Sequence, residues 1–280
     1  MFDFTEKIIP LDDWITAFID WLVEGYRWFF QGLKWPVEVT LSGVEDGFLA
    51  VPPLLMMVIF ALIAWRVSGM KLAIFTAISM LLIGMLGFWD ETMITLAMVF
   101  SSVVFCTVVG VPLGIWAGRS DRFDGFLRPV LDAMQTTPAF VYLVPIVMLF
   151  SIGNVAGVLA TIVFALPPLI RLTSLGIRQV HPELVEAALA FGATGGQVLL
   201  KVQIPLALPT IMAGLNQTIM MALSMVVIAA LIGAGGLGAP VVLGLNTLDI
   251  GLATVGGLAI VLLAIILDRI TQSMGIQKKK

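Results

Sequence analysis

A polar stretch with helix-breaking residues, Val185–Pro209, interrupts an otherwise strongly apolar sequence. Its residue types suit noncovalent docking, because small alanines let a helix approach a groove on a partner closely. Together with the three residues before it, this stretch forms a predicted docking loop at residues 182–209. The positions that carry the pattern are Glu186, Ala187, Ala188, Gly192, Ile204 and Pro205.

Local signals predict two short helices in this loop. Pro182 fits the first turn of a helix over Glu183–Phe191, and the helix dipole favours the acidic residue at its start. Gly192 can adopt a left-handed conformation and end this helix. Thr194 can then cap a second short helix, which we expect Pro205 to close.

No set of residues typical of catalysis or metal binding accompanies the loop. The sequence has no phosphate-binding G-x-x-x-x-G-K-[ST], no H-E-x-x-H and no G-x-S-x-G. The single histidine, His181, has no second histidine or clustered carboxylates to complete a metal site. The single cysteine, Cys106, lies in an apolar run and is interpreted as a packing residue. We therefore predict no catalytic residue, no metal site and no cofactor in this chain itself.

A glycine cluster formally satisfies the dinucleotide fingerprint G-x-G-x-x-G through Gly233, Gly235, Gly236 and Gly238. The context argues against nucleotide binding, because the segment follows an apolar helix and is not part of a strand-turn-helix unit. We expect instead a tight external loop or a short re-entrant turn over Gly233–Asn246.

The composition places the elements around the docking loop in a membrane. Of the 280 residues, 60% are hydrophobic and 12% are charged, and the mean hydropathy is +1.07. These values lie outside the range of ordinary soluble domains. The formal net charge of −3 gives no indication of nucleic-acid binding. The predicted fold class is an all-α integral membrane protein.

Uncharged runs predict about seven transmembrane helices, since a helix needs about 20 residues to cross the hydrocarbon core. One run is long enough for two crossings, with a break at the turn-forming segment Ser151–Asn154, and another holds one crossing plus a glycine-rich connection. The runs are Phe48–Trp65, Leu72–Trp89, Met93–Gly118, Ala133–Ile170, Val202–Leu248 and Ile250–Leu267.

Basic residues predict the orientation, because lysine and arginine accumulate in short cytoplasmic loops. The loops around Asp90, around Asn154 and over Gly233–Asp249 contain no lysine or arginine, so we expect them outside. The amino terminus is then outside and the carboxyl terminus inside. The basic residues of the expected inner segments are Arg66, Lys71, Arg119, Arg122, Arg128, Arg171, Arg178, Lys201, Arg269 and Lys278–Lys280.

Three regions follow from this topology: an outer-face amphipathic segment at residues 1–47, a transmembrane domain at residues 48–270 and a basic cytoplasmic tail at residues 271–280. The first segment predicts an interfacial helix that lies along the membrane, with a loosely held tail as the alternative. It lacks the pattern of a cleavable signal peptide. The residues that recur at helical spacing on its apolar face are Trp14, Phe18, Trp21, Leu22 and Phe29.

The centres of the predicted spans contain no Asp, Glu, Lys, Arg or His. Ion-driven transporters usually keep ionisable groups or broken helices near the centre of the membrane. We therefore expect the energy source for any transport to lie outside this chain. An ion-coupled secondary transporter for a small osmolyte and a membrane scaffold without transport activity are the alternatives.

The docking loop resembles the EAA loop of ABC-importer permeases, whose pattern is E-A-A, three residues, G, nine residues, I-x-L-P. The spacing is kept, with Val202 in place of Ile and Ile204 in place of Leu. From about Ile9 to Gln272 the chain resembles the permease subunit of glycine betaine/proline importers of the ProU type. The further stretches that carry this resemblance are Leu131–Pro145, Phe164–Arg171, Asn216–Thr218 and Ala222–Val227.

The resemblance implies the type I ABC-importer permease fold and a set of partners at the inner membrane of a bacterium. These partners are a second copy of the chain, two ATP-binding subunits that dock on the EAA helices and hold ATP and Mg, and a periplasmic or surface-tethered substrate-binding protein. The implied substrate is glycine betaine or a related compound such as proline betaine, choline, carnitine or trimethylamine N-oxide. We expect an aromatic cage that selects among them to lie in the binding protein.

Polar residues within the spans are candidates to line the conduit. One group surrounds Pro138, which we expect to kink the fourth span, and the other lies on the sixth span. Hydrogen bonds between helices are the alternative role for all of them. The candidates are Gln135, Thr136, Thr137, Tyr142, Asn216, Gln217 and Ser224.

Overall fold

A computed structural model describes residues 11–275, and every regular element over these residues is a helix. The all-α prediction is therefore confirmed. The α-helices are α1 (Leu11–Ala50), α2 (Pro53–Ser68), α3 (Met70–Met85), α4 (Trp89–Arg119), α5 (Asp121–Thr136), α6 (Leu143–Phe150), α7 (Asn154–Arg178), α8 (Pro182–Ala190), α9 (Gly195–Val198), α10 (Ile204–Ala229), α11 (Gly238–Thr247) and α12 (Ile250–Gly275). Two 3-10 helices, η1 (Ala139–Tyr142) and η3 (Ala230–Ile232), and one π-helix, η2 (Leu199–Gln203), connect them.

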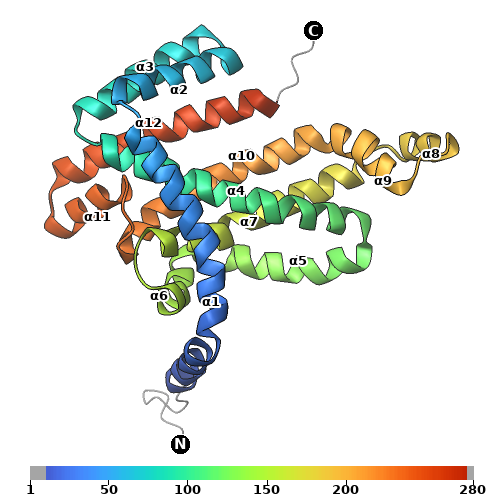
Figure 1. Ribbon diagram of the computed structural model, residues 1–280, viewed down its shortest axis with the longest axis horizontal. Helices are drawn as coiled ribbons and strands as arrows, with labels where there is room; N and C mark the ends of the chain where they lie inside the picture. Colours follow the sequence, from blue (N-terminus) through green and yellow to red (C-terminus); the bar gives the residue numbers. More distant parts are fainter. Residues whose placement is uncertain (1–10, 276–280) are drawn as a thin grey trace, which may run out of the picture.

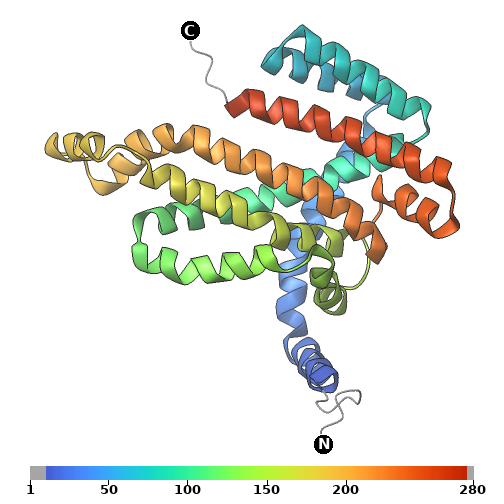
Figure 2. The same cartoon turned by 180° about the vertical axis from the view of Figure 1, so that it is seen from behind.

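Three long helices, α4, α7 and α10, pack side by side and form the centre of the molecule (Figures 1 and 2). The α8–α9 segment projects at one end of these helices, and α11 lies at the other end (Figure 1). The α2–α3 hairpin packs with α12 beside this centre, and α5 lies against α4 and α7. The docking loop therefore lies at the opposite end of the bundle from the glycine-rich connection.

Fewer helices than predicted are long enough to cross a membrane. Within the described part of the chain, four stretches qualify by length and composition: α4, α7, Gly195–Ile232 and Ile250–Ser273. Two bent pairs, α1 with α2 and α5 with η1–α6, raise the number to six if each pair is one span. The finding is thus four to six spans instead of about seven.

The difference has a geometric reason. The first two predicted runs form α2 and α3, and each of these helices has 16 residues. Such a helix is about 24 Å long, whereas the hydrocarbon core is about 30 Å thick. The run from Ala133 does break before Asn154 as predicted, but its first part is shared between the end of α5, η1 and the eight-residue α6. Hydropathy alone could not distinguish this bent path from a straight crossing.

Glycines on α4 let it approach α7 closely. Gly110, Gly114 and Gly118 recur at every fourth position. A Cβ atom added at Gly114 would lie 2.5 Å from the Cβ of Thr173, and one added at Gly118 would lie 2.9 Å from the Cβ of Ile177. Small residues at this spacing allow close backbone contact between membrane helices. The spacing of the glycines is visible in the sequence, but the helix that they contact is not.

The first helix combines an exposed part and a packed part. α1 is kinked at Tyr26, which has non-helical backbone angles, and it continues past residue 47, the predicted end of the amphipathic segment, to Ala50. The part before Tyr26 exposes Trp14 and Phe18, in keeping with an interfacial helix, which stays a prediction. The part after it contacts α4 and α6 and buries Val37 and Leu41, with 3% and 2% of their surfaces exposed. The predicted segment and tail also include residues 1–10 and 276–280, which lie outside the described residues.

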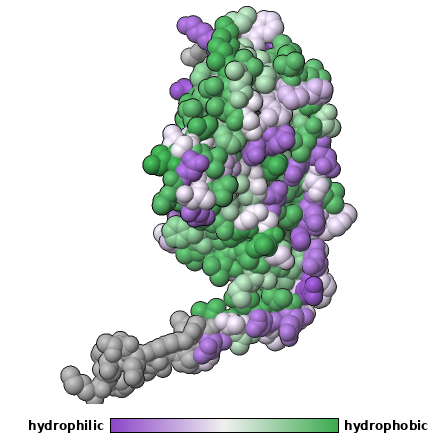
Figure 3. Space-filling view, turned by 90° about the vertical axis from the view of Figure 1, so that its left-hand side faces the viewer, coloured by the Kyte–Doolittle hydropathy of each residue, from purple (hydrophilic) through white to green (hydrophobic). Residues whose placement is uncertain are grey.

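The surface agrees with a membrane environment. Large apolar side chains such as Leu54, Ile78 and Val108 are more than half exposed. Seen from the α11 end, most of the surface is hydrophobic, and hydrophilic residues gather along one side (Figure 3). A soluble protein rarely exposes apolar patches of this extent, so hydrocarbon is the solvent that this surface fits.

Candidate functional site: the docking loop and the polar residues of the bundle

The first helix of the docking loop forms as predicted. Pro182 occupies the first turn of α8, and Gly192 follows its end with a φ of +83°. The N–H of Ala193 donates to the carbonyl of Ala188 at 3.1 Å, which satisfies a carbonyl group that the helix leaves free. A side chain at Gly192 would be strained at this φ, so glycine is the residue type that suits the turn.

The second helix starts as predicted but ends differently. The Thr194 hydroxyl accepts from the N–H of Gln197 at 3.4 Å, and the Gln197 side chain accepts from the N–H of Thr194 at 2.8 Å. This capping box begins α9. The prediction that Pro205 closes the helix is wrong, because the π-helix Leu199–Gln203 leads directly into α10, where Pro205 lies in the first turn. The wider π turn lets the helical path continue past the missing N–H of Pro205.

The loop presents a mixed apolar and polar surface at the end of the molecule. Glu186 and Ala187 are exposed, Ala188 and Ile204 are half-buried, and the ring of Phe191 is 94% exposed. A hollow of about 350 Å³ lies beside this ring. It is lined by Ala188, Phe191, Gly192, Ala193, Gln197, Lys201 and Val202. A protruding ring next to a hollow is a shape that a complementary protein surface can bind.

The first group of conduit candidates lies at a bend. The chain turns by 104° between α5 and the η1–α6 segment, around Thr137–Pro138. The hydroxyls of Thr136 and Thr137 donate to carbonyls one turn earlier in α5, at 3.0 and 2.8 Å. The Tyr142 hydroxyl donates to the carbonyl of Met134 and ties the segment after the bend to α5. These three hydroxyls donate within the bend and keep their oxygens as acceptors. Lining a conduit remains the predicted role of these residues and of Gln135, which is half-buried.

The second group divides between two roles. The Asn216 amide donates to the carboxylate of Asp268 at 3.2 Å and accepts from the hydroxyl of Thr271. Asn216 thus links α10 to α12, which is the alternative role that the sequence left open. Gln217 and Ser224 lie on an exposed side of α10, so lining a conduit remains their predicted role.

The glycine cluster forms a tight turn before α11. Gly233 and Gly236 have φ values of +76° and +82°. A Cβ atom added at Gly236 would lie 2.5 Å from the Oγ1 of Thr95, and one added at Gly238 would lie 2.9 Å from the Cα of Val227. Backbone conformation favours glycine at positions 233 and 236, and close packing favours it at positions 236 and 238, so the structure gives these glycines a role that needs no nucleotide.

Two hydrogen bonds join this turn to the predicted outer loop at Asn154 and to the first turns of α4. The N–H of Gly235 donates to the Oδ1 of Asn154 at 2.6 Å. The N–H of Leu237 donates to the Oγ1 of Thr95 at 2.8 Å. The loop around Asn154 and the Gly233–Asp249 segment, both predicted to lie outside because they lack basic residues, therefore meet at one end of the bundle.

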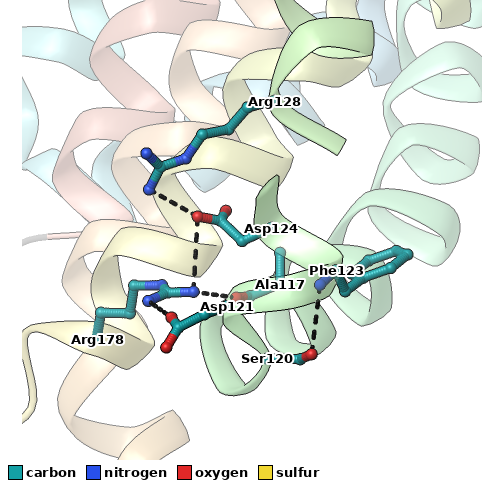
Figure 4. A network of polar contacts seen from close by, with 7 residues as sticks. All are labelled: Ala117, Ser120, Asp121, Phe123, Asp124, Arg128 and Arg178. Atoms are coloured by element: carbon teal, nitrogen blue, oxygen red, sulfur yellow. Dashed lines mark hydrogen bonds and ion pairs between the residues drawn. The ribbon is translucent and has the colours of Figure 1, made fainter. Parts of the chain in front are cut away.

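A network of charges fastens α5 to α7 at the end that carries the docking loop. The Arg178 guanidinium contacts Asp121 at 2.5 Å, the carbonyl of Ala117 at 2.6 Å and Asp124 at 3.6 Å (Figure 4). Asp124 also pairs with Arg128 at 2.6 Å. Nearby, Arg171 of α7 pairs with Asp132 of α5. These arginines belong to the expected inner segments, and their acidic partners could not be predicted from the sequence.

A cavity of about 310 Å³ lies beside this network. It is lined by Asp124, Arg128, Leu131, Asp132, Ile170, Arg171, Ser174, Leu175 and Arg178. Every charged side chain in this lining, Asp124, Arg128, Asp132, Arg171 and Arg178, belongs to an ion pair. Over residues 11–275, no three His, Cys, Asp or Glu side chains are grouped so that they could hold a metal ion.

An apolar helical bundle with a rigidly capped, exposed helix at one end defines a multi-pass membrane protein that presents a docking element. Residues 110–274 match the family model described as "Binding-protein-dependent transport system inner membrane component". The chain belongs to this family of ABC-importer permeases.

Relatives extend the match over nearly the whole chain. It is 57% identical to the glycine betaine/proline betaine transport system permease protein ProW of Escherichia coli (strain K12), over 97% of this chain and 77% of that protein. It is 49% identical to the glycine betaine transport system permease protein OpuAB of Bacillus subtilis (strain 168), over 97% of this chain and 96% of that protein. The resemblance found in the sequence is therefore confirmed.

A solved structure supports the fold. The chain is similar to a chain of the MetNI methionine ABC transporter in an inward-facing conformation, with 28% identity and a TM-score of 0.55. The match covers 65% of this chain and 89% of that one. The type I importer permease fold predicted from the docking loop is confirmed by this similarity and by the family match.

Proposed function

We propose that this chain is the membrane subunit of an ATP-driven importer for glycine betaine or a related quaternary ammonium or methylated amine compound. The observation that carries the proposal is the 57% identity, over 97% of this chain, to a permease named for glycine betaine and proline betaine. A permease named for trimethylamine N-oxide, TmoV of Pelagibacter ubique (strain HTCC1062), is 42% identical over 75% of this chain. The substrate class therefore includes compounds that carry a methylated nitrogen.

The proposed assembly contains two copies of this chain, two ATP-binding subunits and a substrate-binding protein on the outer side. Each ATP-binding subunit docks on α8, where exposed Glu186 and Ala187 are available to a groove. ATP and Mg bind to that subunit, and hydrolysis takes place there. The amino terminus is outside and the carboxyl terminus inside, as the inner arginines favour.

The contribution of this chain is to convert movement at the docking loop into opening of a path. ATP-driven closure of the two partner subunits draws the paired docking loops together, and the helices joined to them rotate. The path then opens outward to receive the substrate, and hydrolysis returns it to the inward orientation. Exposed Gln217 and Ser224 on α10 are the proposed polar contacts along this path, because uncharged groups bind a zwitterion weakly enough to release it.

The test is purification of the tagged chain from its native membrane in a mild detergent, followed by reconstitution into liposomes. The expected result is a co-purifying ATPase whose activity rises when the substrate-binding protein and glycine betaine are added. Uptake should stop when ATP is withheld and continue when ion gradients are abolished. Uptake that survives without ATP but fails without an ion gradient would replace this proposal with the ion-coupled carrier.

A further inference from the structure

The arginine at the end of α7 is placed where movement of the docking loop must enter the bundle. Arg178 is the last residue of α7, and only three residues separate it from Pro182, the first residue of α8. One of these three, Val180, is buried, with 9% of its surface exposed. The connection is therefore short, and one of its residues is buried. We expect a displacement of α8 to move Arg178 as well.

Arg178 joins three helices through a single side chain. It belongs to α7, its Nη2 atom donates to the carbonyl of Ala117 in α4, and its two terminal nitrogens pair with Asp121 and Asp124 of α5 (Figure 4). The planar guanidinium supplies these contacts at fixed angles, which a lysine ammonium does not. One residue thus fixes the start of α5 against the other two helices.

The contacts of Arg178 differ in strength, because their partners differ in solvent exposure. The side chain of Asp121 is 91% exposed, so its ion pair is screened by water and contributes little. The side chain of Asp124 is 14% exposed and that of Arg178 is 31% exposed. Asp124 is therefore the residue of α5 on which the link to Arg178 depends most, whereas the carbonyl of Ala117 ties Arg178 to α4.

Little else ties α5 to α7. Leu131 is the buried residue of α5, whereas Phe126 and Val130 are 72% and 45% exposed. Farther along α5, Asp132 pairs with Arg171 of α7, but both side chains are substantially exposed. α4 and α7 meet at their glycines without help from polar side chains, whereas α5 contacts α7 through one buried apolar residue and these ion pairs. The position of α5 relative to α7 therefore depends on polar contacts.

The first turn of α5 has a separate attachment to α4. The rings of Trp116 and Phe123 stack with their centroids 3.8 Å apart, and the Ser120 hydroxyl accepts from the N–H of Phe123 at 3.4 Å. These contacts do not involve Arg178. Removing the guanidinium should therefore leave α5 folded and attached to α4, while the start of α5 loses its ion pairs to α7.

We propose that Arg178 is the positioning residue that makes α5 follow the docking loop. When a partner subunit displaces α8, Arg178 carries α5 with it, and α5 passes the movement to the bend at Thr137–Pro138 beside Gln135. This proposal rests on the proposed transport function. It assigns to the charge network a role in coupling partner movement to the conduit, separate from docking of the partner itself.

The test compares Arg178→Gln with Arg122→Gln in the complete transporter, reconstituted with its ATPase and binding protein. Arg122 is an exposed arginine in the first turn of α5, next to Asp121, and it makes none of the network contacts described above. In Arg178→Gln we expect the ATPase to co-purify and to hydrolyse ATP at close to the wild-type rate, since α8 is unchanged. The amount of glycine betaine taken up per ATP should fall by about tenfold or more, the loss expected when hydrogen bonds to a charged group are removed. The KM for glycine betaine should be unchanged.

Three further variants test how uptake per ATP depends on the individual contacts of Arg178. Arg178→Lys should recover part of the uptake per ATP, because an ammonium can reach one carboxylate but cannot also hold the carbonyl. Asp124→Asn should resemble Arg178→Gln, and Asp121→Asn should resemble wild type, in line with their exposure. Wild-type coupling in Arg178→Gln would overturn the proposal, and so would loss of the ATPase from that variant, which would assign Arg178 to docking. A wild-type chain that retains no ATPase would instead contradict the proposed function.

A distance measurement needs no change at Arg178. Spin labels on cysteines at Phe126 of α5 and Gly196 of α9 report whether α5 and the docking loop move together; both positions are exposed. We expect the same label-to-label distance with and without a non-hydrolysable ATP analogue. Labels at Gly196 and Leu258 of α12 should show a distance that changes. A Phe126–Gly196 distance that changes as much as the second pair would overturn the proposal.

Discussion

Glu186 tests whether a single exposed side chain governs docking. Because it is exposed, the change Glu186→Lys should leave the folded chain nearly as stable as before. In the complex, however, it would place a lysine where the partner's groove meets a carboxylate, and an unfavourable charge contact costs several kcal/mol. We expect the ATPase to be lost on purification and osmolyte uptake to be abolished, while the amount of chain in the membrane is unchanged. Glu38→Lys, a charge reversal on an exposed residue of α1, is the control. Normal uptake in Glu186→Lys would contradict the assignment of α8.

Single residues were predictable where their partners are close in the sequence. Gly192 ends α8 and Thr194 caps α9 through contacts within five residues, so local preferences were enough. Asn216 and Asp268 are 52 positions apart, and their hydrogen bond depends on how α10 packs against α12. The same holds for Arg178 and Asp121, 57 positions apart. A polar residue in a span is equally suited to a conduit and to a bond between helices until its neighbours are known.

At the level of helices, Gly114 tests how closely α4 and α7 must pack. In Gly114→Ala the added Cβ would lie 2.5 Å from the Cβ of Thr173, so the helices must separate. Overpacking of this kind typically costs about 1–3 kcal/mol. Gly125→Ala in α5 is the matched control, because a Cβ there meets nothing within 4 Å and alanine favours a helix. We expect a lower midpoint of thermal unfolding in detergent for Gly114→Ala only. Equal midpoints for the two variants would show that the close approach is dispensable.

The positions of helices along the sequence were predicted better than the direction of the chain from one helix to the next. The break before Asn154 and the start of α8 at Pro182 follow from turn and capping residues, and both were found. The path of the chain past Pro205 was not, since a proline signals a break unless a π turn absorbs it. The kink expected at Pro138 was found, as a bend of 104°. Its size could not be predicted, because hydropathy indicates the surroundings of a segment and not its direction. The number of spans was therefore overestimated although their locations were largely correct.

The whole molecule has two chemically different ends. The docking loop and the paired arginines Arg171 and Arg178 lie toward one end of the bundle, and the turn at Gly233–Leu237 meets Asn154 at the other. This separation fits the predicted alternation of inner and outer connections. Which end faces the cytoplasm rests on the excess of lysine and arginine at the docking-loop end. The separation also lets two cysteine positions report the orientation independently.

The orientation predicts opposite labelling of Gly195→Cys and Leu248→Cys in intact cells. Gly195 begins α9 in the docking loop, and Leu248, which is 87% exposed, lies between α11 and α12. A membrane-impermeant maleimide added from outside should modify the cysteine at position 248 and leave the one at position 195 unmodified. After the membrane is permeabilised, both should react, which shows that neither position is sterically blocked. The native Cys106 is buried, so the unsubstituted chain provides the background. Labelling of position 195 from outside would reverse the orientation and place the docking loop where no ATP-hydrolysing partner could reach it, so the proposed coupling would fail together with the topology.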